Sequence, residues 1–307
     1  MNSRKRFRQL MAGPATTLKP GVYDALSARI CEVQGFQAVT SGGYAAIGTL
    51  LAQPDMGQCN MRDFVDHYAR IAAAVSIPVY ADADTGFGGV NNVKQMVRAF
   101  ERAGDAGIFF GDQVFPNRCG FMAGKQIVPV EQMIAKIKAA LDAREDPDLF
   151  ITARTDALAV QGLDAAIERA QIYKELGADM AKINGTNNIE DYKRIRRELS
   201  GPQTATMSEA NAIPKVSVAE YEAAGAEMIS FPSTALFAAA AGVWRVMEGL
   251  QKERSLAGVR AHIMKLQDFY DLVGMKAQVE AEERYNAEAL DLLSQRPAVA
   301  AADSKPA

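Results

Sequence analysis

The chain has 307 residues, of which 49% are hydrophobic and 23% are charged, and its formal net charge is −3. These values are typical of a globular protein with one large domain or two small ones, and they give no indication of a nucleic-acid-binding or membrane surface. No apolar run approaches the ~20 residues needed to cross a bilayer. Three cysteines are too few for a disulfide framework and suit a reducing compartment, so we expect a cytoplasmic protein.

Short apolar or β-branched segments alternate with amphipathic ones along the chain. The expected strands, some with the loop that follows them, are residues 15–23, 36–43, 77–89, 106–113, 148–157, 178–185, 203–209 and 226–233. The expected helices are residues 24–35, 61–75, 90–104, 129–144, 162–177, 188–199, 217–225 and 234–253.

Eight strand–helix repeats without a linker predict an α/β fold, a (β/α)8 TIM-type barrel. A doubly wound sheet is the alternative, but it usually has a Gly-rich phosphate turn after its first strand, and "GVYDALSA" (21–28) does not match that pattern. We expect one domain over residues 1–290, with extra C-terminal helices after residue 255 that cover a barrel end or dock on a neighbouring subunit. The last stretch, "RPAVAAADSKPA" (296–307), is small and polar, and residues 291–307 are predicted to form a disordered tail.

The strongest chemical signal is "ADADTGFGG" (81–89), directly after the third expected strand. Asp82 and Asp84 alternate with alanine, so in an extended chain both carboxylates point to the same face. Two such carboxylates repel unless a cation or a proton lies between them. Oxygen ligands without a nearby His or Cys suit Mg²⁺ or Mn²⁺, whereas the alternative is a solvated loop with capping aspartates.

Other residues at the expected strand ends could bind an anion. The turn Ser41-Gly42-Gly43 offers unobstructed backbone N–H groups for a carboxylate or an enolate oxygen, although it could also be an ordinary turn. Arg154, at the end of the fifth strand, could bind a substrate carboxylate bidentately or pair with an acid of the protein.

The loop "FFGDQVFPNRCGFMAGK" (109–125) carries Cys119 between Arg118 and Gly120. Arg118 and a nearby dication would favour the thiolate, which could act as a base or, once protonated, as an acid toward a carbanion. The glycines would let the loop fold over the site and exclude water. The alternative is an inert loop cysteine.

These motifs together resemble the isocitrate lyase/phosphoenolpyruvate mutase superfamily. "SGGYA", "PD", "YADADTGFG", "DQVFPNRCG" with "GK", and "ITARTDA" occur in the family's order within residues 5–285. The cysteine loop is most similar to the methylisocitrate lyase branch, which includes dimethylmalate lyase. The resemblance implies an α/β barrel that forms a homotetramer, a dimer of dimers, with a C-terminal helix swapped between subunits.

The resemblance also implies roles for individual residues. Asp82 would bind Mg²⁺ directly, with Mn²⁺ as a substitute, and Asp55 and Asp84 would hold metal-bound waters. Cys119, assisted by Arg118, would protonate the carbanion or enolate left when the C–C bond breaks. The residues implied to bind the carboxylic acid substrate are Ser41, Gly42, Gly43, Gly120, Arg154, Asn184 and Thr206.

The implied reaction is the cleavage of a 2-hydroxy di- or tricarboxylate, such as 2-methylisocitrate or 2,3-dimethylmalate, to pyruvate or a related keto acid. Two alternatives stay open. The first is an oxaloacetate hydrolase or decarboxylase, or a phosphonopyruvate-processing enzyme. The second is a non-catalytic relative, because Gly111, Asn117, Phe121 and Asn184 depart from the residues usual in the family's lyases.

Overall fold

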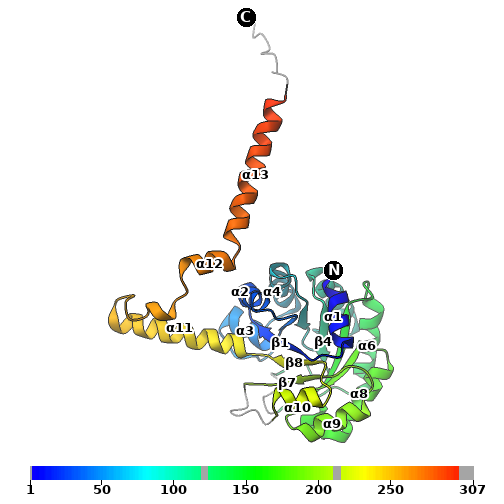
Figure 1. The fold of residues 1–307 in the computed structure, drawn as a ribbon. Helices are drawn as coiled ribbons and strands as arrows, with labels where there is room; N and C mark the ends of the chain where they lie inside the picture. Colours follow the sequence, from blue (N-terminus) through cyan, green and yellow to red (C-terminus); the bar gives the residue numbers. More distant parts are fainter. Residues whose placement is uncertain (1, 119–123, 210–215, 297–307) are drawn as a thin grey trace, which may run out of the picture. The chain divides into compact units, whose positions relative to one another are not determined.

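The computed structural model describes residues 2–118, 124–209 and 216–296, and it confirms the barrel prediction. Parallel strands form one eight-stranded sheet in the order β6-β5-β4-β3-β2-β1-β8-β7, surrounded by helices (Figure 1). The strands are β1 (Thr17–Val22), β2 (Val39–Ser41), β3 (Val79–Asp82), β4 (Gly107–Gly111), β5 (Phe150–Thr155), β6 (Met180–Ile183), β7 (Thr204–Thr206) and β8 (Met228–Phe231). Each expected strand is therefore present.

The barrel is nearly closed, with its seam between β6 and β7, which stand at the two ends of the strand order. Side chains connect the two strands there. Gln203, just before β7, donates from Nε2 to the carbonyl oxygen of Ala181 at 3.0 Å, and Lys182 Nζ donates to Thr206 Oγ1 at 3.1 Å. The seam thus places a charged side chain of β6 toward β7.

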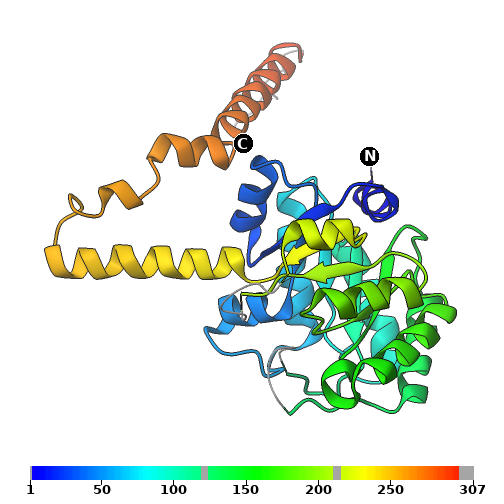
Figure 2. The ribbon, with the colours of Figure 1, turned by 60° about the horizontal axis from the view of Figure 1, so that its bottom comes forward.

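Helices follow the strands and lie on the outside of the sheet (Figure 2). They are α2 (Ala25–Val33), α3 (Gly43–Leu51), α4 (Met61–Ala74), α5 (Val90–Ala103), α6 (Val130–Ala143), α7 (Ala157–Gln161), α8 (Leu163–Glu175), α9 (Ile189–Glu198), α10 (Val218–Ala223) and α11 (Thr234–Glu253). Asp24 caps α2 as expected, because its carboxylate accepts the backbone N–H of Ser27 at 2.7 Å. The short helices α3 and α7 were not expected from the sequence.

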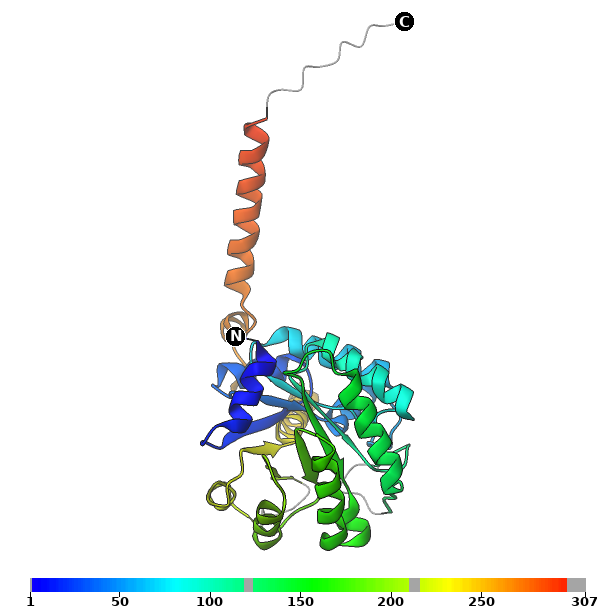
Figure 3. The same cartoon turned by 90° about the vertical axis from the view of Figure 1, so that its right-hand side faces the viewer.

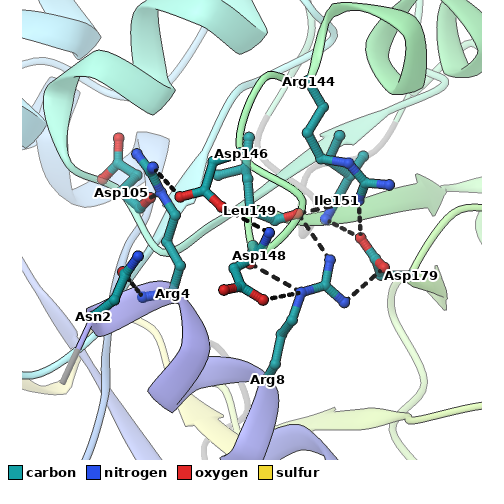
Figure 4. A network of polar contacts seen from close by, with 10 residues as sticks. All are labelled: Asn2, Arg4, Arg8, Asp105, Arg144, Asp146, Asp148, Leu149, Ile151 and Asp179. Carbon is teal, nitrogen blue, oxygen red and sulfur yellow. Dashed lines mark hydrogen bonds and ion pairs between the residues drawn. The ribbon is translucent and has the colours of Figure 1, made fainter.

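An N-terminal helix, α1 (Ser3–Ala12), was also not expected; it closes the end of the barrel at which the strands begin (Figure 3). Phe7 is fully buried there and stacks on the Tyr80 ring, with 5.2 Å between ring centroids. Arg8 donates to the Asp179 carboxylate at 3.0 Å, and Arg4 donates to the Asp146 carboxylate at 2.7 Å (Figure 4). Basic side chains on one face of α1 therefore tie this helix to the loops that precede β5 and β6.

The described chain divides into two compact units, residues 1–244 and 245–307. The second unit contains the end of α11, a 3-10 turn (Arg260–His262), α12 (Leu266–Leu272) and α13 (Met275–Ser294). Helices thus follow the eight repeats, as expected, and α13 extends to Ser294. A single domain over residues 1–290, the tail from 291 and the exchange of a helix between subunits remain predictions, and residues 297–307 lie outside the described residues.

Candidate active site

A cavity of about 110 Å³ lies at the carboxyl ends of the strands, and every strand from β2 to β8 contributes to its wall. Its lining residues are Thr40, Gly42, Gly43, Tyr44, Asp55, Tyr80, Asp82, Phe109, Asn117, Arg118, Arg154, Lys182, Asn184, Thr206, Ser230 and Pro232. Most of the residues predicted from the sequence to act together therefore meet in one place. The carboxyl end of the strands is also where barrel enzymes hold their active sites.

A larger cavity, about 360 Å³, lies near α1 and the start of β1. Its lining residues are Gln9, Leu10, residues 13–18 and residues 34–37, and none of them is acidic, basic or a cysteine. This cavity lacks the groups needed for acid–base or metal chemistry. The smaller cavity is therefore the candidate active site.

Asp82, the last residue of β3, is held by backbone donors. Its Oδ2 accepts the N–H of Gly43 at 3.1 Å, and its Oδ1 accepts the N–H of Asp84 at 2.9 Å. Burial raises the pKa of Asp82, and Arg154 opposes this increase. The Gly43 N–H was expected to face a ligand, but in this structure it donates to Oδ2 of Asp82.

Asp55 and Asp84 stand near Asp82, and Arg154 offsets only part of the negative charge of this group. Burial, followed by repulsion from Asp82, raises the pKa of Asp55 to about 6 and raises the pKa of Asp84 well above its ordinary value. Asp84 is 9% exposed, does not line the cavity, and its Oδ1 is buried without a hydrogen-bond partner among the described residues. A carboxylate oxygen in that state needs a proton, a water molecule or a cation.

These three carboxylates fit a hydrated magnesium ion. Within residues 2–118, 124–209 and 216–296, no three acidic, histidine or cysteine side chains converge to bind one ion together. Magnesium does not require such convergence, because it usually keeps several waters and binds one or two carboxylates directly. The unpartnered oxygen of Asp84 and the excess of negative charge beside Asp82 are what such an ion would satisfy.

Arg154 supplies the positive side of the cavity. Its guanidinium donates from Nε to Oδ2 of Asp156 at 2.9 Å, and its Nη2 lies 2.8 Å from the same oxygen. Asn184 donates to Oδ1 of Asp156 at 2.8 Å. Burial opposes ionisation of Asp156, but Arg154 and Asn184 together lower its pKa below the ordinary value. Asp156 therefore fixes two predicted substrate-binding residues, a role that the sequence reasoning missed.

Ser41 was predicted to bind the substrate, but its position differs from the expected one, and Asp112 at the end of β4 is also away from the cavity. Ser41 is 1% exposed and does not line the cavity, and its Oγ has no partner among the residues that the structure describes. Asp112 is fully buried and accepts from Thr155 Oγ1 at 2.7 Å and from Tyr173 OH at 2.9 Å. Asp112 is thus part of the scaffold beneath β4 and β5 rather than of the cavity wall.

The cysteine loop is described only in part. Arg118 lines the cavity, and its backbone exchanges two hydrogen bonds of 3.1 Å with the side chain of Gln113. Lys125, on the far side of the loop, lies 3.7 Å from Asp156 Oδ1. Cys119, Gly120 and Phe121 lie outside the described residues, so their roles remain predictions.

Lys182 is the main cavity residue that the sequence analysis missed. It is on β6 directly opposite Arg154 in the ladder, and burial together with Arg154 lowers its pKa to about 8. The period-two alternation of "MAKI" (180–183) places Ala181 and Ile183 on one face of the strand and Lys182 on the other, which was the signal available in the sequence. The cavity thus holds two basic side chains as well as its carboxylates.

Comparison with known proteins agrees with this geometry. Residues 7–251 match the family model described as phosphoenolpyruvate phosphomutase. The 2,3-dimethylmalate lyase of Eubacterium barkeri is 38% identical over 93% of this chain and 99% of its own length, and a 2-methylisocitrate lyase of Aeropyrum pernix is 34% identical over 94% and 92%.

Solved structures show the same fold. Oxaloacetate acetylhydrolase in complex with 3,3-difluorooxalacetate has a TM-score of 0.87 at 27% identity, over 93% of this chain and 97% of that one. Phosphonopyruvate hydrolase in complex with oxalate and Mg²⁺ has a TM-score of 0.83 at 26% identity, over 93% and 99%. The resemblance seen in the sequence is confirmed: the chain belongs to the phosphoenolpyruvate mutase/isocitrate lyase superfamily.

Proposed function

We propose that the protein is a Mg²⁺-dependent carbon–carbon lyase. It cleaves a 2-hydroxy di- or tricarboxylate of the 2,3-dimethylmalate or 2-methylisocitrate type to pyruvate, or a related keto acid, and a second carboxylic acid. The observation that supports this most strongly is the meeting of Asp55, Asp82 and Arg154 in one cavity at the barrel's carboxyl end. The relatives named as lyases, at 34–38% identity over most of the chain, support the same reaction class.

Asp82 is proposed to hold the metal ion directly, and Asp55 of the cavity wall and the neighbouring Asp84 are proposed to hold it through water. Magnesium, when bound, stabilises negative charge on the oxygen that becomes the keto group. Manganese has the same preference for oxygen ligands and is expected to substitute.

The basic side of the cavity is proposed to orient the substrate. Arg154 uses one edge of its guanidinium for Asp156, so the other edge can bind the carboxylate next to the hydroxyl-bearing carbon. Asn184 and Thr206 lie on the same wall and would select the second half of the substrate. Gly42 adds a backbone N–H at the turn after β2, where no side chain obstructs an anion.

Cys119 is proposed to protonate the carbanion that remains after bond cleavage, with Arg118 beside it. A thiol positioned in this way contributes typically 10²–10⁴-fold to a rate as a general acid. Cys119→Ser is expected to abolish turnover and leave keto acid binding intact, and unchanged turnover in this variant would remove the thiol from the mechanism.

Oxaloacetate cleavage is the second candidate. It is supported by the fold shared with oxaloacetate acetylhydrolase bound to 3,3-difluorooxalacetate, and the fold shared with phosphonopyruvate hydrolase makes phosphonopyruvate a further substrate to assay. A non-catalytic protein that binds a small acid is the alternative motivated by Gly111, Asn117, Phe121 and Asn184. Assays of the hydroxy acids, oxaloacetate and phosphonopyruvate side by side distinguish these functions.

The protein is further proposed to act in the cytoplasm as a homotetramer. None of the described helices is both long and apolar enough to cross a membrane. The carboxylates and cations of the cavity fit a small acidic substrate rather than a macromolecule.

Activity with Mg²⁺ tests the proposed function. Purified protein should release pyruvate or a related keto acid from 2,3-dimethylmalate or 2-methylisocitrate, and EDTA should abolish the release. Asp82→Asn should lose both turnover and the thermal stabilisation that Mg²⁺ gives to the wild-type protein. Release of no keto acid from any hydroxy acid in the panel would contradict the proposal.

A further inference from the structure

Lys182 is a basic side chain within the cavity wall that the proposed lyase reaction does not use. It lines the cavity, its Nζ donates to Thr206 Oγ1 at 3.1 Å, and it stands opposite Arg154 in the β5–β6 ladder. Among the described residues, it belongs to no ion pair. The amine therefore faces the substrate space with a hydroxyl as its hydrogen-bond partner and a second cation beside it.

Such surroundings favour the neutral amine. Removing a lysine from water and placing it near another cation are the two arrangements that activate lysine as a nucleophile toward carbonyl compounds. With a pKa of about 8, roughly one amine in ten is unprotonated at pH 7. An ordinary exposed lysine is protonated almost completely at that pH.

Three other lysines of the barrel that are buried or partly buried lack these surroundings. Lys19 is fully buried, but it does not line the cavity and its Nζ lies 3.7 Å from the centre of the Tyr80 ring. Lys136 donates to the carbonyl oxygen of Thr85 at 3.0 Å, and Lys125 lies 3.7 Å from Asp156. Among the described lysines, Lys182, which is partly buried, is the one on the cavity wall.

We propose that Lys182 forms an imine with the keto carbon of a 3-carboxy-2-oxo acid such as oxaloacetate, and that the cavity thereby decarboxylates this acid without a metal ion. The inference rests on the proposed function in one respect, that the cavity binds 2-oxo acids. It adds a second activity that uses the amine instead of magnesium to accept electrons.

The neutral amine adds to C2 of the oxo acid, and the adduct takes up a proton and loses water to give a protonated imine. The bond between C3 and C4 breaks and CO₂ leaves. The electron pair of that bond moves through C2 onto the imine nitrogen and forms an enamine. C3 takes up a proton, and water then hydrolyses the protonated imine to release pyruvate, the free amine and one proton. The water lost at the first step returns at the last, so the net change is oxaloacetate plus one proton to pyruvate plus CO₂.

The neighbours of Lys182 suit this sequence. Arg154 can hold the C1 carboxylate, which places C2 on the β5–β6 side of the cavity, where Lys182 also lies. Thr206 Oγ1 accepts a hydrogen bond from Nζ and so fixes the direction of the amine. A positive charge at Arg154 also disfavours protonation of the free amine between turnovers.

Borohydride trapping in EDTA tests the proposal, because borohydride reduces an imine to a stable amine and EDTA removes the metal-dependent route. Full-length protein is incubated with pyruvate and sodium borohydride, and the modified residue is located by peptide mass spectrometry. In parallel, EDTA-resistant oxaloacetate decarboxylation and Mg²⁺-dependent keto acid release from hydroxy acids are measured. Lys182→Met removes the amine, Lys182→Arg keeps the charge without a competent nucleophile, and Lys19→Met is the matched control for a buried lysine.

The expected result is one reduced pyruvyl group on Lys182, lost in both Lys182 variants and retained in Lys19→Met. EDTA-resistant decarboxylation should fall in both Lys182 variants to the rate measured without protein. An unlabelled wild-type protein that still releases keto acid with Mg²⁺ would overturn this inference and leave the lyase function intact. Label on Lys19, or label that persists in Lys182→Met, would overturn the assignment to Lys182. If the wild-type protein acquires no label and also binds no keto acid, both proposals are contradicted.

Discussion

Lys182 and Arg154 place two like charges next to each other in the barrel interior. The free energy of this arrangement depends on pH, because burial and Arg154 lower the pKa of folded Lys182 from 10.5 to about 8. Between these two values the unfolded chain binds more protons than the folded chain, so the free energy of unfolding rises with pH across that window. Below pH 8 both states carry the proton, and the folded protein bears the full penalty.

Lys182→Met is therefore expected to stabilise the protein at pH 7 by about 1–2 kcal/mol, after allowing for the lost hydrogen bond to Thr206. The gain should shrink as the pH rises from 8 to 10.5. Chemical denaturation of both proteins at pH 7 and pH 10 measures this difference. A variant that is less stable at pH 7, or a gain that grows with pH, would contradict the account.

Asp156 holds the side chains of Arg154 and Asn184 in place on the basic side of the cavity. It is fully buried and carries the ion pair with Arg154 and the hydrogen bond from Asn184. Asp156→Asn leaves Arg154 without its buried counterion, so we expect a loss of about 3–5 kcal/mol in the free energy of unfolding and a large increase in KM. Glu190→Gln breaks an exposed pair with Lys193 and is the control, with an expected loss below ~1 kcal/mol. Equal stability of the two variants by urea denaturation would show that Asp156 does not organise the wall.

At the scale of the elements, β1 and the segment after β8 approach each other closely at Gly21 and Pro232. A Cβ atom on Gly21 would lie 2.0 Å from the carbonyl oxygen of Pro232, so only glycine fits there. Gly21→Ala is expected to destabilise the barrel by several kcal/mol, on the order of 3 or more, because backbone must move. Gly242→Ala meets no atom within 4 Å in α11 and should stabilise by about 0.5–1 kcal/mol. Thermal unfolding of both variants checks the pair; a stable Gly21→Ala protein would mean that the two segments are not packed as described.

The repeating strands and helices could be predicted because each has a residue pattern of its own, which does not depend on the rest of the chain. The strand β3 is mostly apolar and ends in Asp82, β5 is rich in β-branched residues and is followed by Asp156, and Asp24 precedes an amphipathic segment, so local chemistry alone locates these elements. Helix α3 follows a glycine turn without a side-chain cap, and α1 has a mostly polar sequence whose role depends on Phe7 reaching Tyr80. Such helices are set by tertiary packing, which a single sequence does not display.

Those residues of the candidate site that lie in recognisable motifs at the carboxyl ends of strands could be predicted from the sequence. Asp82 and Arg154 were identified because they follow buried runs, and the structure puts them in one cavity. Lys182 was missed because its importance arises from Arg154 and Thr206 on the two neighbouring strands, and Asp156 was missed because it also binds Asn184, which follows the next strand. Asp112 shows the opposite case: it stands at a strand end, yet Tyr173 and Arg169 from α8 hold it within the scaffold.

At the scale of the whole molecule, the C-terminal helices carry many exposed apolar side chains. Trp244 is 75% exposed and Leu290 is 70% exposed in the single chain. Large exposed apolar residues in series are typical of surfaces that are buried on assembly. The homotetramer with an exchanged C-terminal helix remains a prediction, and in it these side chains would be covered.

Trp244 is the only tryptophan of the chain, so its fluorescence reports on this surface directly. We expect light scattering to give the mass of a tetramer and the emission maximum to lie at the short wavelength of a buried indole. Trp244→Asp should reduce the mass and leave the far-UV circular dichroism of the barrel intact. A monomeric wild-type protein with the emission of a solvent-exposed indole would contradict the prediction.

The most direct test of the account is the release of keto acid from 2,3-dimethylmalate and 2-methylisocitrate by the wild-type protein, with Mg²⁺ and with EDTA. The account predicts that at least one of these acids gives pyruvate or a related keto acid with Mg²⁺, that EDTA stops the reaction, and that Asp82→Asn is inactive under both conditions. Release of equal amounts of keto acid by wild-type protein and Asp82→Asn, or none from either acid with Mg²⁺ present, would contradict it.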